Sequence, residues 1–270
     1  MSNSSPHSKP IHGTKSLRRM LDLLAKVAAN PDGLSLAELS KGTGIPKSTA
    51  HRILSLMIEH KLVRTNPQTK QYLIGRLVLE YSHAYLKSFN FLEEARPHLL
   101  ELKNQFDETV HLGVLDESGQ RVIYIDKLDS SRAVRMFSRI GQTVPIHCTS
   151  LGKSLVACVP TTALAKSLKD YEFTTYTPNT ITNKEDFIKE LAQVRTQRYA
   201  LDNFEHEETV MCVGTSICNN NGEIIAAISI SFPKQRIPAN GIDNLIQAVI
   251  RTGNNISNHV RNLPSVEIWG

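Results

Sequence analysis

The apolar positions in the first quarter of the chain recur at helical spacing, and polar turns divide them into short segments. A first helix is expected from about residue 14 to residue 29, because its apolar residues repeat every three or four positions: Leu17, Met20, Leu21, Leu24 and Val27. The turn sequence Asn-Pro-Asp-Gly at residues 30–33 ends this helix. Ser35 and Glu38 form a capping-box pattern, which predicts that a second helix begins at Ser35.

The next stretch, GIPKSTAHRILSLMIEHKLV at residues 44–63, predicts a helix with two different faces. One face collects the apolar residues Ala50, Ile53, Leu54 and Met57. Another collects basic and hydroxyl-bearing residues near the helix start: Lys47, Ser48, His51, Arg52 and Ser55. With the short helix and the glycine-containing turn before it, this pattern predicts a helix-turn-helix, whose second helix enters the major groove of DNA.

A hairpin is expected directly after this helix. Residues 62–65 and 71–74 have the composition of short strands, and the sequence Asn-Pro-Gln-Thr at residues 66–69 is typical of a turn. The hairpin would form a wing that brings Arg64 and Lys70 toward phosphates. Seven residues are therefore predicted to contact DNA: Lys47, Ser48, Thr49, His51, Arg52, Arg64 and Lys70. The alternative, a polar helix face that only meets solvent, does not account for the hairpin or for the charge.

The charge of the chain is concentrated where these elements lie. Residues 1–76 carry 12 Lys and Arg against 4 Asp and Glu, whereas residues 77–270 carry 19 against 22. The overall formal charge is +5. A small basic module on a nearly neutral body is the pattern expected when one part of a protein binds a polyanion such as DNA.

Beyond residue 108 the pattern changes to alternating strands and helices. Strands are expected at 110–116, 121–128 and 134–139, with Asp126 and Lys127 exposed near the end of the second. A hairpin is expected from 211–219 and 224–232 around an Asn-rich turn. Helical stretches are expected at 149–159, 161–169, 184–198 and 242–258. This order predicts an α+β domain with a mainly antiparallel sheet.

Several protein classes are excluded by the sequence. No apolar run reaches the length of a membrane helix, and the polar N-terminus lacks the apolar core of a signal peptide, so a cytoplasmic protein without membrane contact is expected. The four cysteines are widely spaced, which favours neither a disulfide framework nor a zinc ribbon. No catalytic triad spacing, HExxH motif or phosphate loop is present, so no enzymatic activity and no cofactor are expected.

The segments KSTAHRIL, YLIG and GRLVLE resemble the N-terminal domain of the IclR family of bacterial transcriptional regulators. The resemblance continues over nearly the whole chain beyond its tail. The polar N-terminus predicts a disordered tail at 1–12. The resemblance implies a winged helix-turn-helix at 13–75, connecting helices at 76–108 and a GAF-like effector-binding domain at 109–263. It also implies a homodimer or homotetramer on a double-stranded DNA operator, with dimer contacts around Tyr81, Tyr85 and Leu99 in the connecting helices.

Three segments of the larger domain carry the resemblance further: SRIGQTVPIHCTSLGKSLVA, YALDNFEHEETVMC and SISF. Matched position by position, they imply an effector pocket formed by Met136, Val144, Ser150, Leu151, Asp202, Val210, Cys212, Ser229 and Ser231. In the family, backbone groups at Ser150 and Leu151 and the two strand serines hold a carboxylate. Free N–H groups at a helix start near Gly152 also favour an anion. Because Asp202 is better suited to hydroxyl groups, the predicted effector is a sugar acid or keto acid.

The sequence also departs from the family pattern beside this pocket. Phe204 stands where the family usually has Glu, Thr209 stands where it has Gly, and Gly-Thr-Ser at 214–216 replaces Ala-x-Pro. The sugar-acid-responsive branch of the family has an arginine similar to Arg135. Arg135 would then pair with the carboxylate of an effector; the alternative is that it is a surface arginine of a strand.

Two other readings of the larger domain remain open. One is a metal sensor that uses His147, Asp202, Glu205 and Cys212 as ligands. The other is a constitutive DNA-architectural protein, against which the polar pocket residues argue.

Overall fold

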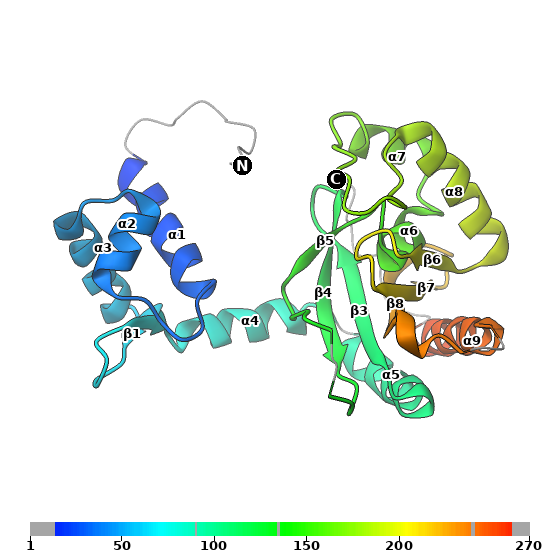
Figure 1. The fold of residues 1–270 in the computed structure, drawn as a ribbon, viewed down its shortest axis with the longest axis horizontal. Coiled ribbons are helices and arrows are strands. Elements are labelled where there is room, and N and C mark those ends of the chain that lie inside the picture. Colours follow the sequence, from blue (N-terminus) through cyan, green and yellow to red (C-terminus); the bar gives the residue numbers. More distant parts are fainter. Residues whose placement is uncertain (1–13, 90, 134–135, 239–240, 261–270) are drawn as a thin grey trace. The chain divides into compact units, whose positions relative to one another are not determined.

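A computed structural model describes residues 14–89, 91–133, 136–238 and 241–260 of the chain. The chain divides into two compact units between Ser88 and Phe89 (Figure 1). The predicted connecting region at 76–108 thus supplies one helix to each unit. The predicted tail at residues 1–12 and the end of the predicted effector domain at 261–263 lie outside the described residues. Within the described ranges, every helix is too short or too polar to serve as a membrane span.

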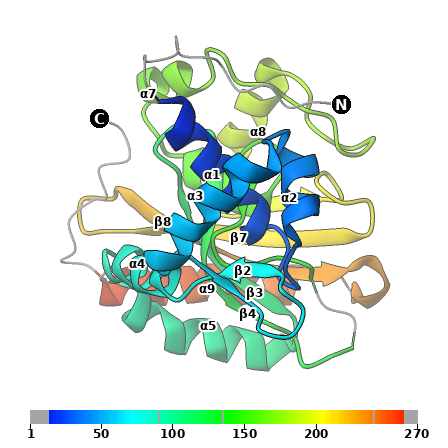
Figure 2. The ribbon, with the colours of Figure 1, turned by 90° about the vertical axis from the view of Figure 1, so that its left-hand side faces the viewer.

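The first unit is a helix-turn-helix followed by a hairpin and one further helix (Figure 2). Ser35 caps the second helix as predicted: the Glu38 N–H donates to Ser35 Oγ at 3.3 Å, and the Ser35 N–H donates to Glu38 Oε2 at 2.8 Å. Gly44, at φ +68°, ends that helix. The elements are α1 (Lys15–Ala28), α2 (Leu36–Thr43), α3 (Lys47–Glu59), β1 (Val63–Thr65), β2 (Tyr72–Ile74) and α4 (Leu77–Lys87).

The apolar face of α3 forms the centre of this unit's core. Ala50, Ile53, Leu54 and Met57 are all buried, and they belong to one cluster with side chains of α1, α2 and the hairpin: Leu23, Val27, Leu39, Val63 and Tyr72. Helix α4, in contrast, has no buried residue. Its apolar side chains Leu79, Tyr81 and Tyr85 are 73%, 58% and 43% exposed.

The second unit is built on a six-stranded antiparallel sheet with the order β5-β4-β3-β8-β7-β6. The predicted hairpin is present as the two long strands β7 and β8. The strands are β3 (Thr109–Leu115), β4 (Arg121–Leu128), β5 (Thr143–Pro145), β6 (Ala200–Asn203), β7 (Val210–Cys218) and β8 (Ile224–Pro233). The combination of an N-terminal helix-turn-helix and a curled antiparallel sheet confirms the predicted fold class.

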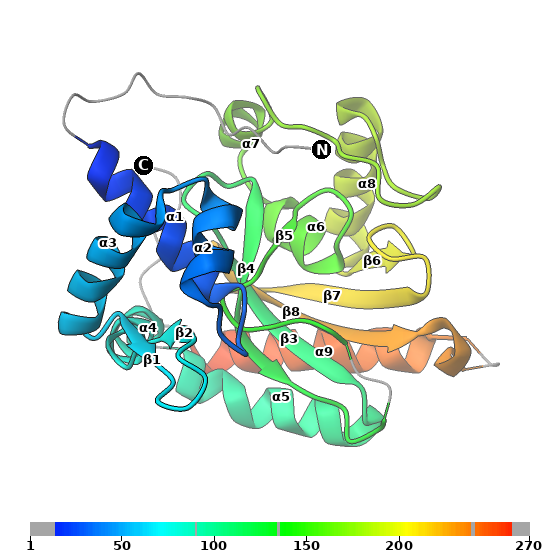
Figure 3. The ribbon, with the colours of Figure 1, turned by 60° about the vertical axis from the view of Figure 1, so that its left-hand side comes forward.

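Helices cover both faces of this sheet (Figures 1 and 3). On one face α5 packs on β3 and β4, and α9 packs on β7 and β8. On the other face α6 packs on β6, β7 and β8, and α8 packs on α6. The helices are α5 (Leu92–Phe106), α6 (Ser150–Val156), α7 (Thr161–Ser167), α8 (Lys184–Gln197) and α9 (Asp243–His259), with a 3-10 turn at Lys234–Arg236.

Some expectations for this unit were wrong. The described part of the predicted strand at 134–139 is not a strand, because the Lys127 ammonium binds the carbonyl oxygens of Met136 and Ser138 at 2.9 and 2.8 Å. Asp126 is 2% exposed rather than exposed, since Arg96 donates to both of its oxygens at 2.6 and 2.8 Å. The short strands β5 and β6 were not predicted.

Two further expectations fail because of packing. Leu99 is buried within its own unit and so cannot contribute to a dimer contact. The Gly152 N–H is not free for an anion, because it donates to the Thr149 side chain at 3.1 Å. Gly152 serves close packing instead: a Cβ there would lie 2.3 Å from Ile146 Cα.

Gly152→Ala is therefore expected to destabilise the second unit, by about 1–3 kcal/mol or more, because the added methyl group overlaps backbone atoms that cannot move aside. The gain of roughly 1 kcal/mol in helix propensity is too small to offset this overlap. Urea denaturation followed by circular dichroism measures the change. Ser154→Ala is the control on the same helix, because the buried Ser154 Oγ has no hydrogen-bond partner among the residues that the structure describes. Equal stability of Gly152→Ala and the wild type would contradict the packing role.

Candidate DNA-binding surface and effector pocket

Helix α3 exposes the face that was predicted to contact DNA. Lys47, Ser48, His51 and Arg52 are exposed near its N-terminus, and Thr49 is half-buried beside them. Pro46, at the N-cap position, makes no side-chain capping bond. The first-turn N–H groups of α3 therefore have no partner inside the helix and are available to a phosphate.

The hairpin carries the two remaining predicted DNA contacts. Arg64 on β1 and Lys70 at the end of the turn are both exposed. Lys70 has a left-handed backbone, at φ +59°. The Asn66 side chain fixes the turn by accepting from the N–H groups of Gln68 and Thr69 at 2.9 and 3.2 Å. The wing thus presents cations on a defined turn.

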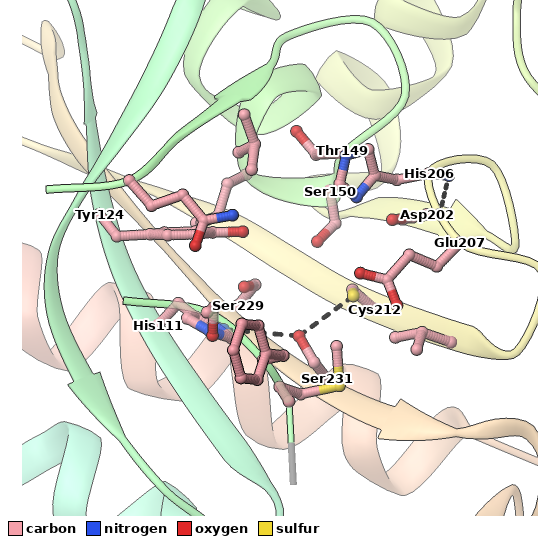
Figure 4. Close-up of a pocket in the computed structure, with 17 residues that line it drawn as sticks. His111, Tyr124, Thr149, Ser150, Asp202, His206, Glu207, Cys212, Ser229 and Ser231 are labelled. Atoms are coloured by element: carbon pink, nitrogen blue, oxygen red, sulfur yellow. Dashed lines mark hydrogen bonds between the residues drawn. The ribbon is translucent and has the colours of Figure 1, made fainter. Parts of the chain in front are cut away.

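All nine predicted effector residues line one cavity of the second unit, with a volume of about 40 Å³ (Figure 4). They come from four strands, from the start of α6 and, for Met136, from the loop before β5, so the sheet brings together segments that are far apart in the sequence. Eight further residues line the same cavity and were not predicted: His111, Tyr124, Phe137, Ser138, Gln142, Thr149, His206 and Glu207.

A chain of hydrogen bonds joins one side of this pocket. The Cys212 thiol donates to Ser231 Oγ at 3.1 Å, and Ser231 Oγ lies 3.5 Å from His111 Nδ1. His111 Nε2 lies 2.7 Å from Ser138 Oγ. Burial lowers the pKa of His111 to about 3, so its ring is neutral and has one donor and one acceptor nitrogen. His111 also stacks on Tyr124 with ring centroids 4.6 Å apart. The pocket therefore has a pre-arranged polar wall.

Asp202 lies on β6 beside Cys212, away from His111 (Figure 4), and is 4% exposed. Its Oδ1 accepts from the N–H groups of Glu205 and His206 at 2.8 and 3.2 Å. Burial raises the pKa of Asp202 to about 7, despite these two hydrogen bonds. This carboxyl group is therefore fixed in position while its charge is poorly stabilised.

A buried lysine supports the loop that carries Asp202. Lys153 is 1% exposed. Its ammonium donates to Glu205 Oε1 at 2.7 Å, to Glu190 Oε1 at 3.0 Å and to the Leu201 carbonyl at 2.8 Å. These bonds join α6 to α8, to β6 and to the loop after it. Lys153 is thus a structural cation behind the pocket rather than an anion ligand within it.

The residues that depart from the family pattern have distinct positions. Phe204 adopts a left-handed backbone at φ +58°, and the Thr209 carbonyl accepts from the Lys234 N–H at 2.8 Å. Gly214 lies under the first residue of α6: a Cβ there would be 3.0 Å from the Ser150 carbonyl carbon. Glycine at this position therefore lets α6 lie close to β7.

The candidate metal ligands do not form a metal site. In the part of the chain that the structure describes, no group of three or more His, Cys, Asp and Glu side chains is arranged to hold a metal ion. His147 lies 2.6 Å from the Tyr171 hydroxyl and 3.1 Å from the Thr174 carbonyl through its two ring nitrogens. Glu205 pairs with Lys153. Arg135, the suggested carboxylate partner, lies outside the described residues.

Comparison with known proteins identifies both units. The IclR helix-turn-helix domain matches residues 16–67, and the C-terminal domain of the bacterial transcriptional regulator IclR matches residues 83–258. The regulator XynR of Escherichia coli is 33% identical over 239 residues, which are 88% of this chain and 94% of XynR. The regulator KdgR of Escherichia coli is 34% identical over 203 residues, which are 75% of this chain and 76% of KdgR.

A solved structure agrees with these matches. The crystal structure of the Thermotoga maritima IclR superposes with a TM-score of 0.78 at 32% identity, covering 92% of this chain and 99% of that one. Because these relatives are transcriptional regulators, the prediction that the chain is not an enzyme is confirmed, as is the resemblance first seen in KSTAHRIL. The chain belongs to the IclR family of DNA-binding bacterial transcriptional regulators.

Proposed function

We propose that this regulator represses genes of carbohydrate or sugar-acid catabolism and releases its operator when a small carboxylate occupies the pocket of the second unit. It would act in the cytoplasm on double-stranded DNA, as a homodimer or homotetramer. The observation that carries the proposal is the convergence of all nine predicted effector residues on one cavity. The similarity to the transcriptional regulators XynR and KdgR is consistent with the resemblance to the sugar-acid-responsive branch of the family.

The DNA part of the proposal rests on α3 and the hairpin. Lys47 and Arg52 are exposed on one face of α3, and the apolar residues that fix the helix in the core lie on another. Arg64 and Lys70 add two exposed cations on the wing. In a winged helix-turn-helix, such a helix reads base edges in the major groove while the wing binds phosphates.

A Lys47→Ala/Arg52→Ala variant should bind an operator selected in vitro more weakly. Loss of Arg52 costs about 1–3 kcal/mol if it reads a guanine edge, and loss of a phosphate contact reduces the salt dependence of affinity. Fluorescence anisotropy at several salt concentrations measures both effects. Lys189→Ala, which removes an exposed lysine of the second unit, is the control and should leave affinity unchanged. Wild-type affinity in the folded double variant would refute the proposed reading surface.

The effector part of the proposal rests on the chemistry of the pocket. Ser150, Ser229 and Ser231 offer hydroxyl donors to a carboxylate, and Met136, Val144 and Val210 supply apolar walls. Asp202 suits the hydroxyl groups of a sugar acid. A cavity of about 40 Å³ is small for a sugar acid, so side chains that line it are expected to move when an effector enters. Phe137, which is 93% exposed, can move without loss of buried surface.

Calorimetric titration with D-gluconate, pyruvate, glucose and benzoate tests the effector class. Binding of gluconate or pyruvate is expected, and Ser229→Ala/Ser231→Ala should weaken it by about tenfold or more, because a charged acceptor loses two donors. Ser118→Ala, in an exposed turn, is the control. The proposal fails if only glucose or benzoate binds, or if acid binding is unchanged in both the double serine variant and Asp202→Ala.

The proposed homodimer rests on helix α4. Apolar side chains at three positions of this helix are largely exposed, although soluble helices usually bury such a stripe. A second copy of the chain would cover Leu79, Tyr81 and Tyr85, and paired modules would match paired half-sites in the operator.

Light scattering at micromolar concentration should therefore give at least the mass of a dimer. Leu79→Glu/Tyr81→Glu should shift the equilibrium toward monomer, because it places charges in an apolar contact. Ile188→Glu, at an exposed apolar position of α8, is the matched control and should leave the mass unchanged. A wild-type monomer at this concentration would be the contradicting result.

A further inference from the structure

The effector pocket contains carboxyl groups but no basic counter-charge among its described lining residues. Two of these residues, Asp202 and Glu207, are acids, and none is Lys or Arg. The two lining histidines, His111 and His206, are kept neutral because burial lowers their pKa values. A carboxylate effector would therefore enter a site that already holds negative charge.

The two acids differ in how their charge is solvated. Glu207 is exposed, so water stabilises its carboxylate. Asp202 is 4% exposed, and its side chain points into the pocket (Figure 4). Its Oδ1 accepts two backbone N–H groups, whereas its Oδ2 has no hydrogen-bond partner among the described residues. Oδ2 is thus the atom of Asp202 that is available to an effector.

The cation that acts on Asp202, Lys153, compensates it only in part. The Lys153 ammonium has three hydrogens, and these are directed to Glu205, Glu190 and the Leu201 carbonyl. Two carboxylates therefore already share its charge. On the β4 side, Lys127 binds the carbonyl oxygens of the loop at 136–138 and pairs with Asp129 at 2.8 Å.

Apart from Glu205, which is paired with Lys153, three other titratable groups around Asp202 are uncharged near neutral pH. They face it from β4, from the segment before α6 and from β7, where Cys212 pairs directly with Asp202 in the sheet. Burial raises the pKa of each of these groups: Tyr124, Cys148 and Cys212. Asp202 is therefore the buried acid of the pocket lining whose own charge can change when an anion arrives.

We propose, resting on the proposed effector function, that the carboxylate effector binds together with one proton from solvent, which Asp202 takes up at Oδ2. Protonation removes the repulsion between two like charges in a buried site. It also creates an O–H donor that can bind the effector carboxylate through a short, charge-assisted hydrogen bond. No other bond forms or breaks. Protonation of Asp202 costs little free energy near neutral pH, since burial already raises the pKa of Asp202 to about 7.

The test is the pH dependence of effector affinity in the full-length protein. D-gluconate and pyruvate are the probes, because their own carboxyl groups stay ionised between pH 6 and pH 8.5. For the wild type, Kd should rise by about tenfold per pH unit above neutrality and change little below it. Calorimetry at pH 8 in buffers of different ionisation enthalpy should detect uptake of about one proton per effector bound. The calorimetric measurement detects proton uptake directly in the wild type, so it needs no variant.

Two variants test whether Asp202 is the group that takes up the proton. Asp202→Asn keeps the acceptor for the two backbone N–H groups and carries a permanent donor, so its Kd should be nearly independent of pH and its proton uptake should vanish. Glu207→Gln, at the other acid of the pocket, should keep the wild-type pH dependence. Circular dichroism shows whether each variant is folded.

The results separate a failure of the proposed effector class from a failure of the proton-uptake inference. If neither acid binds at any pH, the proposed effector class is wrong and this inference falls with it. If an acid binds to the wild type with a Kd independent of pH and without proton uptake, only this inference is overturned. The inference would also be overturned if Glu207→Gln, rather than Asp202→Asn, abolished the pH dependence of Kd.

Discussion

The effector unit depends on one buried ammonium group. Lys153 on α6 contacts α8 through Glu190, β6 through the Leu201 carbonyl and the following loop through Glu205. Burying these charges is costly, and only mutual pairing offsets the cost; removal of one partner from such a cluster typically costs about 3–5 kcal/mol. The position of α6 on the sheet, and with it the position of Ser150 and Leu151 in the pocket, follows from this cluster. The Asp202 loop is held by the same contacts.

The sheet supplies the other half of the pocket. Antiparallel pairing sets His111 opposite Ser229 and sets Cys212 opposite both Ser231 and Asp202. Side chains from four strands therefore meet without any local sequence motif. A rigid wall of hydrogen-bonded groups faces an acid that is held by backbone N–H groups, and the loop at 136–142 completes the site.

The first unit could be predicted from sequence because local rules determine it: a capping box at Ser35, a left-handed Gly44 and a two-faced helix. The prediction of a strand at 134–139 failed because Lys127, on a different segment, binds the carbonyl oxygens there. His111 was missed because a histidine in an alternating strand gives no local signal. Its role appears only once pairing places it beside Ser231 and Tyr124. The nine pocket residues were found through family resemblance, since periodicity alone cannot bring them together.

The Lys153 cluster also determines where this protein can be redesigned as a biosensor. Removal of Lys153 would leave the carboxylates of Glu205 and Glu190 without their cation, so substitutions in this cluster are expected to destabilise the second unit before any new ligand is tested. Met136, Val144 and Val210 contact the cavity through apolar side chains and take no part in that ionic network. Mutant libraries that seek altered ligand selectivity therefore belong at these three positions, with the buried ion cluster left intact.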